Sequence, residues 1–86
     1  MELRLTEPAK NDIRFFVRSG QKGILKKIES LLTDIETSPF YVIGKPEQLK
    51  HNLAGLWSRR INSEHRLVYE VIDDVIFILS VKGHYE

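Results

Sequence analysis

Three segments with strand-like composition follow one another in LAGLWSRRINSEHRLVYEVIDDVIFILSVK, residues 53–82. The segments 53–61, 65–72 and 75–82 are rich in β-branched, aromatic and other apolar residues, as β-strands are. The connections at 62–64 and 73–74 are short enough for hairpins, and hairpins join antiparallel neighbours. This half of the chain therefore predicts an antiparallel arrangement of three strands.

The first 37 residues predict another strand and two helices. Residues 1–5 alternate in polarity, as a strand does. Thr6 can cap a helix with Pro8 in its first turn, and the apolar residues at 9, 13, 16 and 17 form one stripe along that helix. A second helix with one apolar face follows a short turn and runs to about residue 37, where Ser38-Pro39 ends it.

The apolar stripes of both helices need a sheet to cover. The order of the elements thus predicts an α+β fold, in which a two-helix hairpin packs on one face of a small, mostly antiparallel four-stranded sheet. A chain of 86 residues is too short for two independent cores, so we expect a single domain over residues 1–86.

The composition argues against several classes of protein. No cysteine is present, which excludes disulfides, thiolate nucleophiles and cysteine-based zinc sites. Apolar runs are far shorter than the ~20 residues of a membrane span, and the N-terminal residues lack the apolar stretch of a signal peptide. His51 and His65 have no acidic partners at ligand spacing. We therefore expect a cytoplasmic protein without a membrane partner, a metal or another cofactor.

Positive charge is concentrated between residues 45 and 66. The net charge of the chain is +1, yet this stretch holds five lysines and arginines against two acidic residues. The hairpin connection can be a three-residue or a two-residue loop. A three-residue loop at 62–64 places Arg60 directly opposite Arg66, and a two-residue loop places Arg59 there. Like charges in that position destabilise a sheet, so the pair either extends into water or clamps a phosphate.

Two further segments hold groups that could act on such a phosphate. Residues 40–51 have no regular period and predict a loop, in which Glu47 lies between Lys45 and Lys50. Two nearby cations favour the ionised carboxylate, which suits a salt bridge or a general base. His84-Tyr85 offers a proton-transfer group and a ring that can stack on a base, although a terminal pair without a role is the simpler interpretation.

The residues from 44 to 61, GKPEQLKHNLAGLWSRRI, resemble the YoeB toxins of the RelE superfamily. The segment EHRLVY at 64–69 and the closing His84-Tyr85 extend the resemblance, which is strongest from about residue 38 onward. Two positions depart from the family pattern. Gln48 stands where the best-known members have proline, and Gly83 stands where a larger side chain is more usual.

The resemblance implies a toxin of a bacterial toxin–antitoxin system that a YefM-like antitoxin neutralises. It also implies metal-independent cleavage of messenger RNA, typically on the ribosome. By matching positions, Glu47 would be the general base and His84 the general acid, while Arg66 would stabilise charge on the phosphorane and Tyr85 would hold the substrate. RNA or ribosome binding would fall to Lys45, Lys50, His51, Arg59 and Arg60.

The residue types are consistent with that chemistry. No serine, Ser58 included, has a histidine placed by an acid, and no cluster of ligands would hold a metal that generates hydroxide. The remaining nucleophile is the substrate's 2′-hydroxyl, which requires RNA and needs a base, an acid and a cation. Which of Glu47 and His84 is the base stays open, because a histidine near pH 7 can serve either way.

Two other readings of the sequence predict no cleavage. In the first, the chain is a non-catalytic, toxin-like module that binds operator DNA together with its antitoxin. In the second, it is a free RNA-binding domain with salt-sensitive affinity. The composition does not decide between a monomer and a homodimer.

Overall fold

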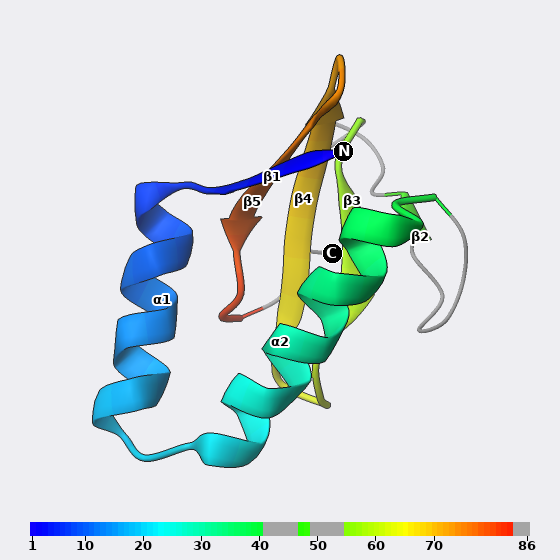
Figure 1. Ribbon diagram of the computed structural model, residues 1–86. Coiled ribbons are helices and arrows are strands. Elements are labelled where there is room, and N and C mark those ends of the chain that lie inside the picture. Colours follow the sequence, from blue (N-terminus) through cyan, green and yellow to red (C-terminus); the bar gives the residue numbers. More distant parts are fainter. Residues whose placement is uncertain (41–46, 49–54, 84–86) are drawn as a thin grey trace.

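The computed structural model describes residues 1–40 and 55–83 and the backbone of residues 47–48. The elements follow in the order β1 (Glu2–Leu5), α1 (Glu7–Arg18), α2 (Lys22–Thr37), β2 (Glu47–Gln48), β3 (Trp57–Arg60), β4 (Arg66–Ile72) and β5 (Val75–Ser80). The sheet has the strand order β1-β5-β4-β3-β2, with α2 lying across it and α1 beside β5 (Figure 1). The predicted α+β fold is confirmed.

The sheet is mixed, because β1 pairs with β5 in parallel while the other neighbours are antiparallel. It also has a fifth strand that the sequence analysis missed. The two-residue β2 forms inside the segment predicted as a loop, where it pairs with β3. A strand this short has no periodic pattern of its own, so its tertiary partner alone defines it. The rest of the predicted loop lies outside the described residues.

The strand predicted at 53–61 is shorter in the structure, since β3 begins at Trp57. Gly55 has a φ of +90°, a conformation that glycine adopts readily and other residues avoid. The extended backbone therefore starts after this turn.

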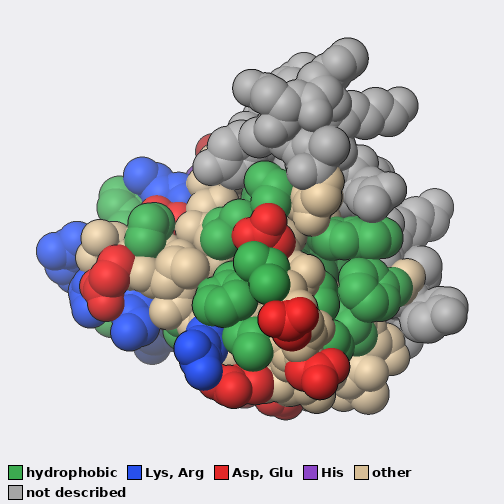
Figure 2. All heavy atoms as spheres, turned by 90° about the horizontal axis from the view of Figure 1, so that it is seen from above, with side chains coloured by type: hydrophobic (Ala, Val, Ile, Leu, Met, Phe, Trp, Pro, Cys, Tyr) green, Lys and Arg blue, Asp and Glu red, His purple; other side chains and the backbone are tan. Residues whose placement is uncertain are grey.

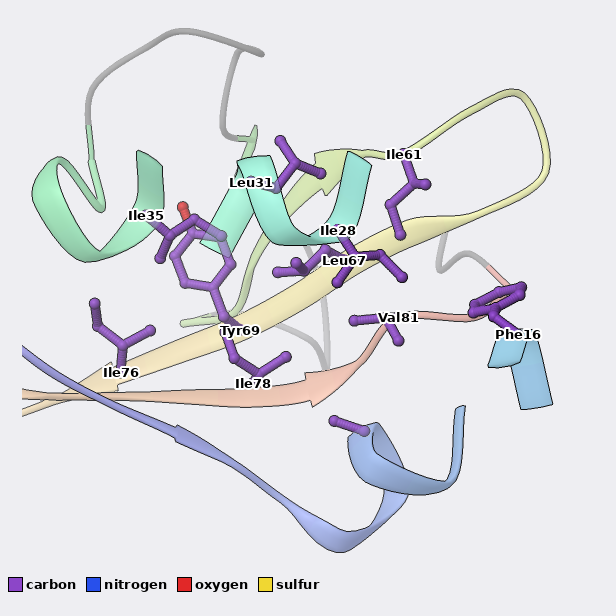
Figure 3. Packing of buried hydrophobic residues seen from close by; sticks show 11 residues of the cluster. Phe16, Ile28, Leu31, Ile35, Ile61, Leu67, Tyr69, Ile76, Ile78 and Val81 are labelled. Carbon is purple, nitrogen blue, oxygen red and sulfur yellow. The ribbon is translucent and has the colours of Figure 1, made fainter. Parts of the chain in front are cut away.

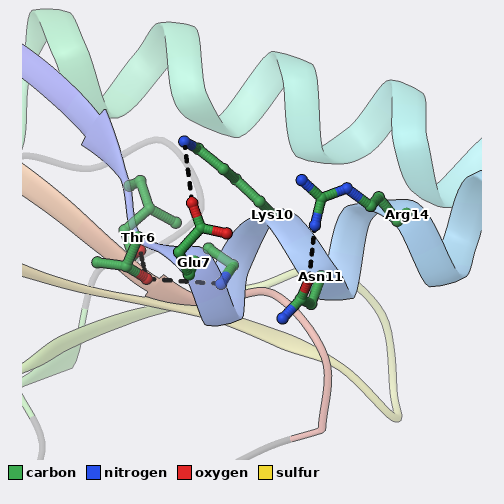
Figure 4. Close-up of polar contacts among 7 residues, drawn as sticks. Thr6, Glu7, Lys10, Asn11 and Arg14 are labelled. Atoms are coloured by element: carbon green, nitrogen blue, oxygen red, sulfur yellow. Dashed lines mark hydrogen bonds and ion pairs between the residues drawn. The ribbon is translucent and has the colours of Figure 1, made fainter.

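The start of α1 follows the prediction closely. Thr6 is the N-cap, and its Oγ1 accepts a hydrogen bond from the Ala9 amide at 3.5 Å (Figure 4). The same hydroxyl donates to the Ile78 carbonyl of β5 at 2.7 Å. One side chain therefore caps the helix and fixes its first turn to the sheet.

The hydrophobic core lies between the helices and the sheet (Figure 3). Ala9 and Phe16 of α1 are completely buried, and the sheet contributes completely buried side chains from β4 and β5: Leu67, Tyr69, Ile76 and Ile78. The helix α2 contributes a buried stripe at a spacing of three and four residues. The buried members of this cluster are Ala9, Phe16, Ile28, Leu31, Ile35, Ile61, Leu67, Tyr69, Ile76, Ile78 and Val81.

Part of the surface is apolar. Seen from above, hydrophobic side chains reach the surface among acidic ones (Figure 2). The large exposed hydrophobic residues are Met1, Phe15, Val17, Phe40 and Ile72. Within the described part of the chain, no helix is both long and apolar enough to cross a membrane.

A buried arginine joins α2 to the sheet. Arg59 of β3 is 0% exposed, and its Nη2 donates to the Ser38 carbonyl at 2.7 Å. Its Nε donates to the Tyr69 hydroxyl at 3.4 Å, and that hydroxyl donates to the Pro39 carbonyl at 2.6 Å. The structure therefore encloses the Arg59 guanidinium among protein groups, whereas the prediction that Arg59 binds RNA needs this guanidinium at the surface; RNA binding by Arg59 stays a prediction.

The Tyr69 hydroxyl makes the stability of this cluster dependent on pH. Burial raises the pKa of Tyr69 above its ordinary value of 10.0, and the hydrogen bond and charge of Arg59 oppose part of that rise. A raised pKa means that folding favours the neutral phenol. The stabilisation is therefore complete below the unfolded pKa and is lost as the pH rises through the folded pKa.

We expect Tyr69→Phe to lower the free energy of unfolding by about 1–2 kcal/mol at pH 7, because it removes the donor to Pro39. The difference in the free energy of unfolding between the two proteins should narrow above pH ~10. There the tyrosine of the unfolded wild type ionises, which destabilises the folded wild type, whereas the phenylalanine variant has no such group. Urea denaturation of both proteins at neutral and alkaline pH measures this gap. A gap that stays constant or widens with pH would contradict the assignment.

Candidate functional site

The hairpin between β3 and β4 places two arginines side by side. Arg60 and Arg66 are in direct register, as one of the two predicted registers requires. The connection is held by the His65 carbonyl, which accepts from the Ile61 and Asn62 amides at 3.0 and 3.2 Å. The Asn62 Oδ1 accepts in turn from the amides of Glu64 and His65 at 2.9 and 2.8 Å. This side-chain turn makes the register, and hence the arginine pair, a fixed feature of the fold.

A pocket of about 190 Å³ lies at this end of the hairpin, lined by Arg60, Asn62, Ser63 and Arg66. Arg60 is exposed and Arg66 is half-buried, so both can be approached from solvent. The Arg66 Nε donates to the Oγ of Ser58 at 3.0 Å, and Ser58 is completely buried. That bond fixes the plane of the guanidinium. Two cationic groups at a pocket lined by polar side chains are suited to bind an anion such as a phosphate.

Glu47 enters this region through the backbone of β2. The register places it directly opposite Ser58, which is itself opposite Val68 of β4. Residues in register on adjacent strands belong to the same face of a sheet. The Glu47 position therefore lies on the face to which Ser58 and Arg66 belong, one strand away from the residue that orients the Arg66 side chain.

The chain also returns to Arg66 just before His84. The Arg66 amide donates to the Gly83 carbonyl at 2.7 Å, so Gly83, the last described residue, is hydrogen-bonded to the backbone of Arg66. The structure thus brings together Arg60, Arg66, the position of Glu47 and the start of the C-terminal segment. Five other predicted site residues, Lys45, Lys50, His51, His84 and Tyr85, lie outside the described residues.

Sequence reasoning missed three residues that build this site. Ser58 orients Arg66, Asn62 fixes the turn, and His65 contacts Gly83. For Ser58 the signal was the hairpin register, because a serine two residues before Arg60 lies on the same face of the strand. For Asn62 it was the preference of asparagine for such turns. For His65 no local signal exists, since its partner is 18 residues away.

No group of three or more histidine, aspartate or glutamate side chains that could hold a metal ion occurs among residues 1–40 and 55–83. The site therefore consists, within the described residues, of two cations and their polar supports. It belongs to a small α+β protein whose central hairpin ends at a pair of arginines.

Comparison with known proteins assigns the family. Residues 5–85 match the family described as YoeB-like toxin of bacterial type II toxin-antitoxin system, and the chain belongs to this family. It is 48% identical to a toxin YoeB from Synechocystis over 86 residues, covering 100% of this chain and 99% of that protein.

The solved structures that are similar to this chain include a toxin, a toxin–antitoxin complex and a toxin dimer. A YoeB/ParE toxin from Agrobacterium tumefaciens has a TM-score of 0.91 at 37% identity, covering 99% of this chain and 100% of the other. A YoeB–YefM complex and a YoeB dimer, both from Staphylococcus aureus, have TM-scores of 0.83 and 0.84. Both of these are 45% identical to the chain, with coverage of 99% of this chain and 98% of each other chain.

The adjacent residues Arg59 and Arg60 provide a matched pair of variants. We expect Arg59→Met to lower the free energy of unfolding by about 2–4 kcal/mol, because it takes hydrogen-bond donors from the Ser38 carbonyl and the Tyr69 hydroxyl in the interior. Arg60→Met should change it by less than about 0.5 kcal/mol, because Arg60 is exposed. Chemical denaturation of both variants makes the comparison. Equal effects of the two substitutions would contradict the different placement of these side chains.

Proposed function

We propose that this toxin is an endoribonuclease that cleaves messenger RNA on the ribosome and thereby inhibits translation. The observation that carries the proposal is the pairing of Arg60 with Arg66 at one pocket, on the sheet face to which the Glu47 position belongs. A phosphate between two arginines would accept charge-assisted hydrogen bonds from both, which offsets the repulsion between like charges directly opposite each other. The resemblance of the chain to YoeB toxins supports the same reading.

The proposed reaction uses the substrate's own nucleophile. A base removes the proton of the 2′-hydroxyl, and the 2′-oxygen attacks the adjacent phosphorus. The bond to the 5′-oxygen breaks, and an acid protonates that leaving oxygen. Glu47 and His84 fill the roles of base and acid, Arg66 stabilises the charge of the phosphorane, and Tyr85 holds the substrate. The products are a 2′,3′-cyclic phosphate and a 5′-hydroxyl, and no metal or other cofactor takes part.

Arg66 is suited to act mainly on the transition state. Its guanidinium is held in place by Ser58 before any substrate binds, so little reorganisation is needed when negative charge develops. Arg60 is exposed, which suits a contact with the RNA backbone. Lys45, Lys50 and His51 would extend this contact along the RNA or ribosomal RNA.

The antitoxin partner of this toxin would be a YefM-like protein. A Staphylococcus aureus relative that is 45% identical over nearly the whole chain has been solved as a YoeB–YefM complex, and a YoeB of the same identity from that organism has been solved as a dimer. We propose that this chain is neutralised by a YefM-like antitoxin in the cytoplasm and can form a homodimer. Operator DNA would be bound by the complex with the antitoxin rather than by the toxin alone.

We expect Arg66→Ala to lower the single-turnover rate of RNA cleavage by about 10²–10³-fold, because it removes a preorganised donor to the transition state. Its effect on RNA affinity should be much smaller. Lys50→Ala is the contrasting variant, since it should weaken binding and reduce the salt dependence of the affinity. A large loss of affinity in Arg66→Ala with an unchanged rate would refute the assigned role.

A message with a 2′-deoxy or 2′-O-methyl group at the scissile nucleotide should resist cleavage, because the nucleophile is missing or blocked. The unmodified message should give a 2′,3′-cyclic phosphate end, also in EDTA where the assay tolerates it. Mapping of the product ends checks both statements. Cleavage of the modified message at the normal rate would exclude 2′-hydroxyl attack. Binding without any cleavage would favour the non-catalytic alternative.

A further inference from the structure

The backbone that leads into His84 is anchored on both sides of Gly83. The Gly83 amide donates to the Nδ1 of His65 at 2.9 Å, and the Gly83 carbonyl accepts from the Arg66 amide at 2.7 Å. The two contacts come from adjacent residues, His65 just before β4 and Arg66 at its start. Gly83 is therefore held in a fixed position relative to Arg66, one residue before the segment to which we assign proton transfer.

The first of these contacts fixes the chemical state of the His65 ring. A ring nitrogen that accepts a hydrogen bond carries no proton, so the single proton of the neutral imidazole is on Nε2. A protonated imidazole has no acceptor and could not hold the Gly83 amide. The contact thus requires neutral His65 in one tautomer.

The helix α1 packs against the His65 ring. The ring of Phe16, which is completely buried, meets the imidazole edge to face at a centroid distance of 5.1 Å. The same helix holds the preceding residues, because Asp12 Oδ2 accepts from the Val81 amide at 3.0 Å and the Lys82 Nζ lies 4.2 Å from the centre of the Phe15 ring. The imidazole is therefore confined between a core aromatic ring and the backbone that it holds.

Gly83 suits this anchor because of its backbone conformation. Its φ is +75°, which an L side chain adopts at a cost in strain. A Cβ built at Gly83 would meet no atom within 4 Å, so the cost of a larger residue would come from the backbone and not from a clash. The glycine that departs from the family pattern lets the chain present both its amide and its carbonyl to residues 65 and 66.

We infer that His65 is a positioning residue: its neutral Nδ1 holds the Gly83 amide and thereby sets where the chain enters His84 and Tyr85. The inference rests on the proposed function for the roles of those two residues. The anchor itself depends on the geometry around Gly83 and can be measured without any substrate.

Two substitutions separate the acceptor of His65 from its ring. His65→Phe keeps an aromatic ring against Phe16 and removes the acceptor. His65→Asn removes the ring and can place its Oδ1 where Nδ1 lies. We expect the Gly83 amide to lose hydrogen-exchange protection in His65→Phe and to keep most of it in His65→Asn. The Val81 amide, which Asp12 holds, is the internal control and should stay protected in both variants. In the wild type, ¹⁵N shifts should show the Nε2-protonated tautomer of His65.

With RNA, His65→Phe should lower the single-turnover rate by about 10–100-fold and change the affinity little, because a displaced catalytic group costs rate rather than binding. His65→Asn should recover most of the rate. An unchanged Gly83 protection in His65→Phe, or a normal rate despite lost protection, would overturn the inference. Failure of the proposed function has a different signature, since wild-type protein would then not cleave RNA while the exchange pattern at Gly83 stayed as expected.

Discussion

The buried guanidinium of Arg59 is the interaction on which the arrangement of helix, sheet and site depends. A charge in the interior is costly unless its donors are hydrogen-bonded, and here they are directed at the Ser38 carbonyl and the Tyr69 hydroxyl. The same hydroxyl reaches the Pro39 carbonyl. Arg59 and Tyr69 thus satisfy two backbone acceptors at the end of α2. These contacts fix the end of α2, where the chain leaves the helix, against β3 and β4.

Side chains alternate between the two faces of a strand, so Arg59 lies in the core while its neighbour Arg60 lies at the candidate site. Arg59 is in register with Leu67, a core residue, so it belongs to the face that the helices cover. Arg60 is in register with Arg66 and belongs to the opposite face. A shift of one residue in the hairpin register would exchange the two faces. Arg60 would then enter the core, and Arg59 would face solvent. The turn built by Asn62 therefore determines both the stability of the core and the composition of the site.

Most of the fold could be predicted because its signals are local. The cap at Thr6, the stripes of α1 and α2 and the short hairpin connections are each encoded within a few residues. The burial of Arg59 could have been predicted in part, because the register that pairs Arg60 with Arg66 also pairs Arg59 with core Leu67. The strand β2 and the His65–Gly83 contact could not, because each depends on segments that meet only in the folded chain.

Arg66 is the residue at which these constraints meet. Its side chain is oriented by Ser58, its amide holds Gly83, and its register partner is Arg60. Like charges directly opposite each other on neighbouring strands repel, and an opposite charge at one of the two positions would favour the hairpin instead. The fold holds these two arginines between a fixed turn and the buried hydroxyl of Ser58. Two cations held in register, one of them oriented by a buried hydroxyl, are suited to bind an anion, because an anion between them would attract both arginines.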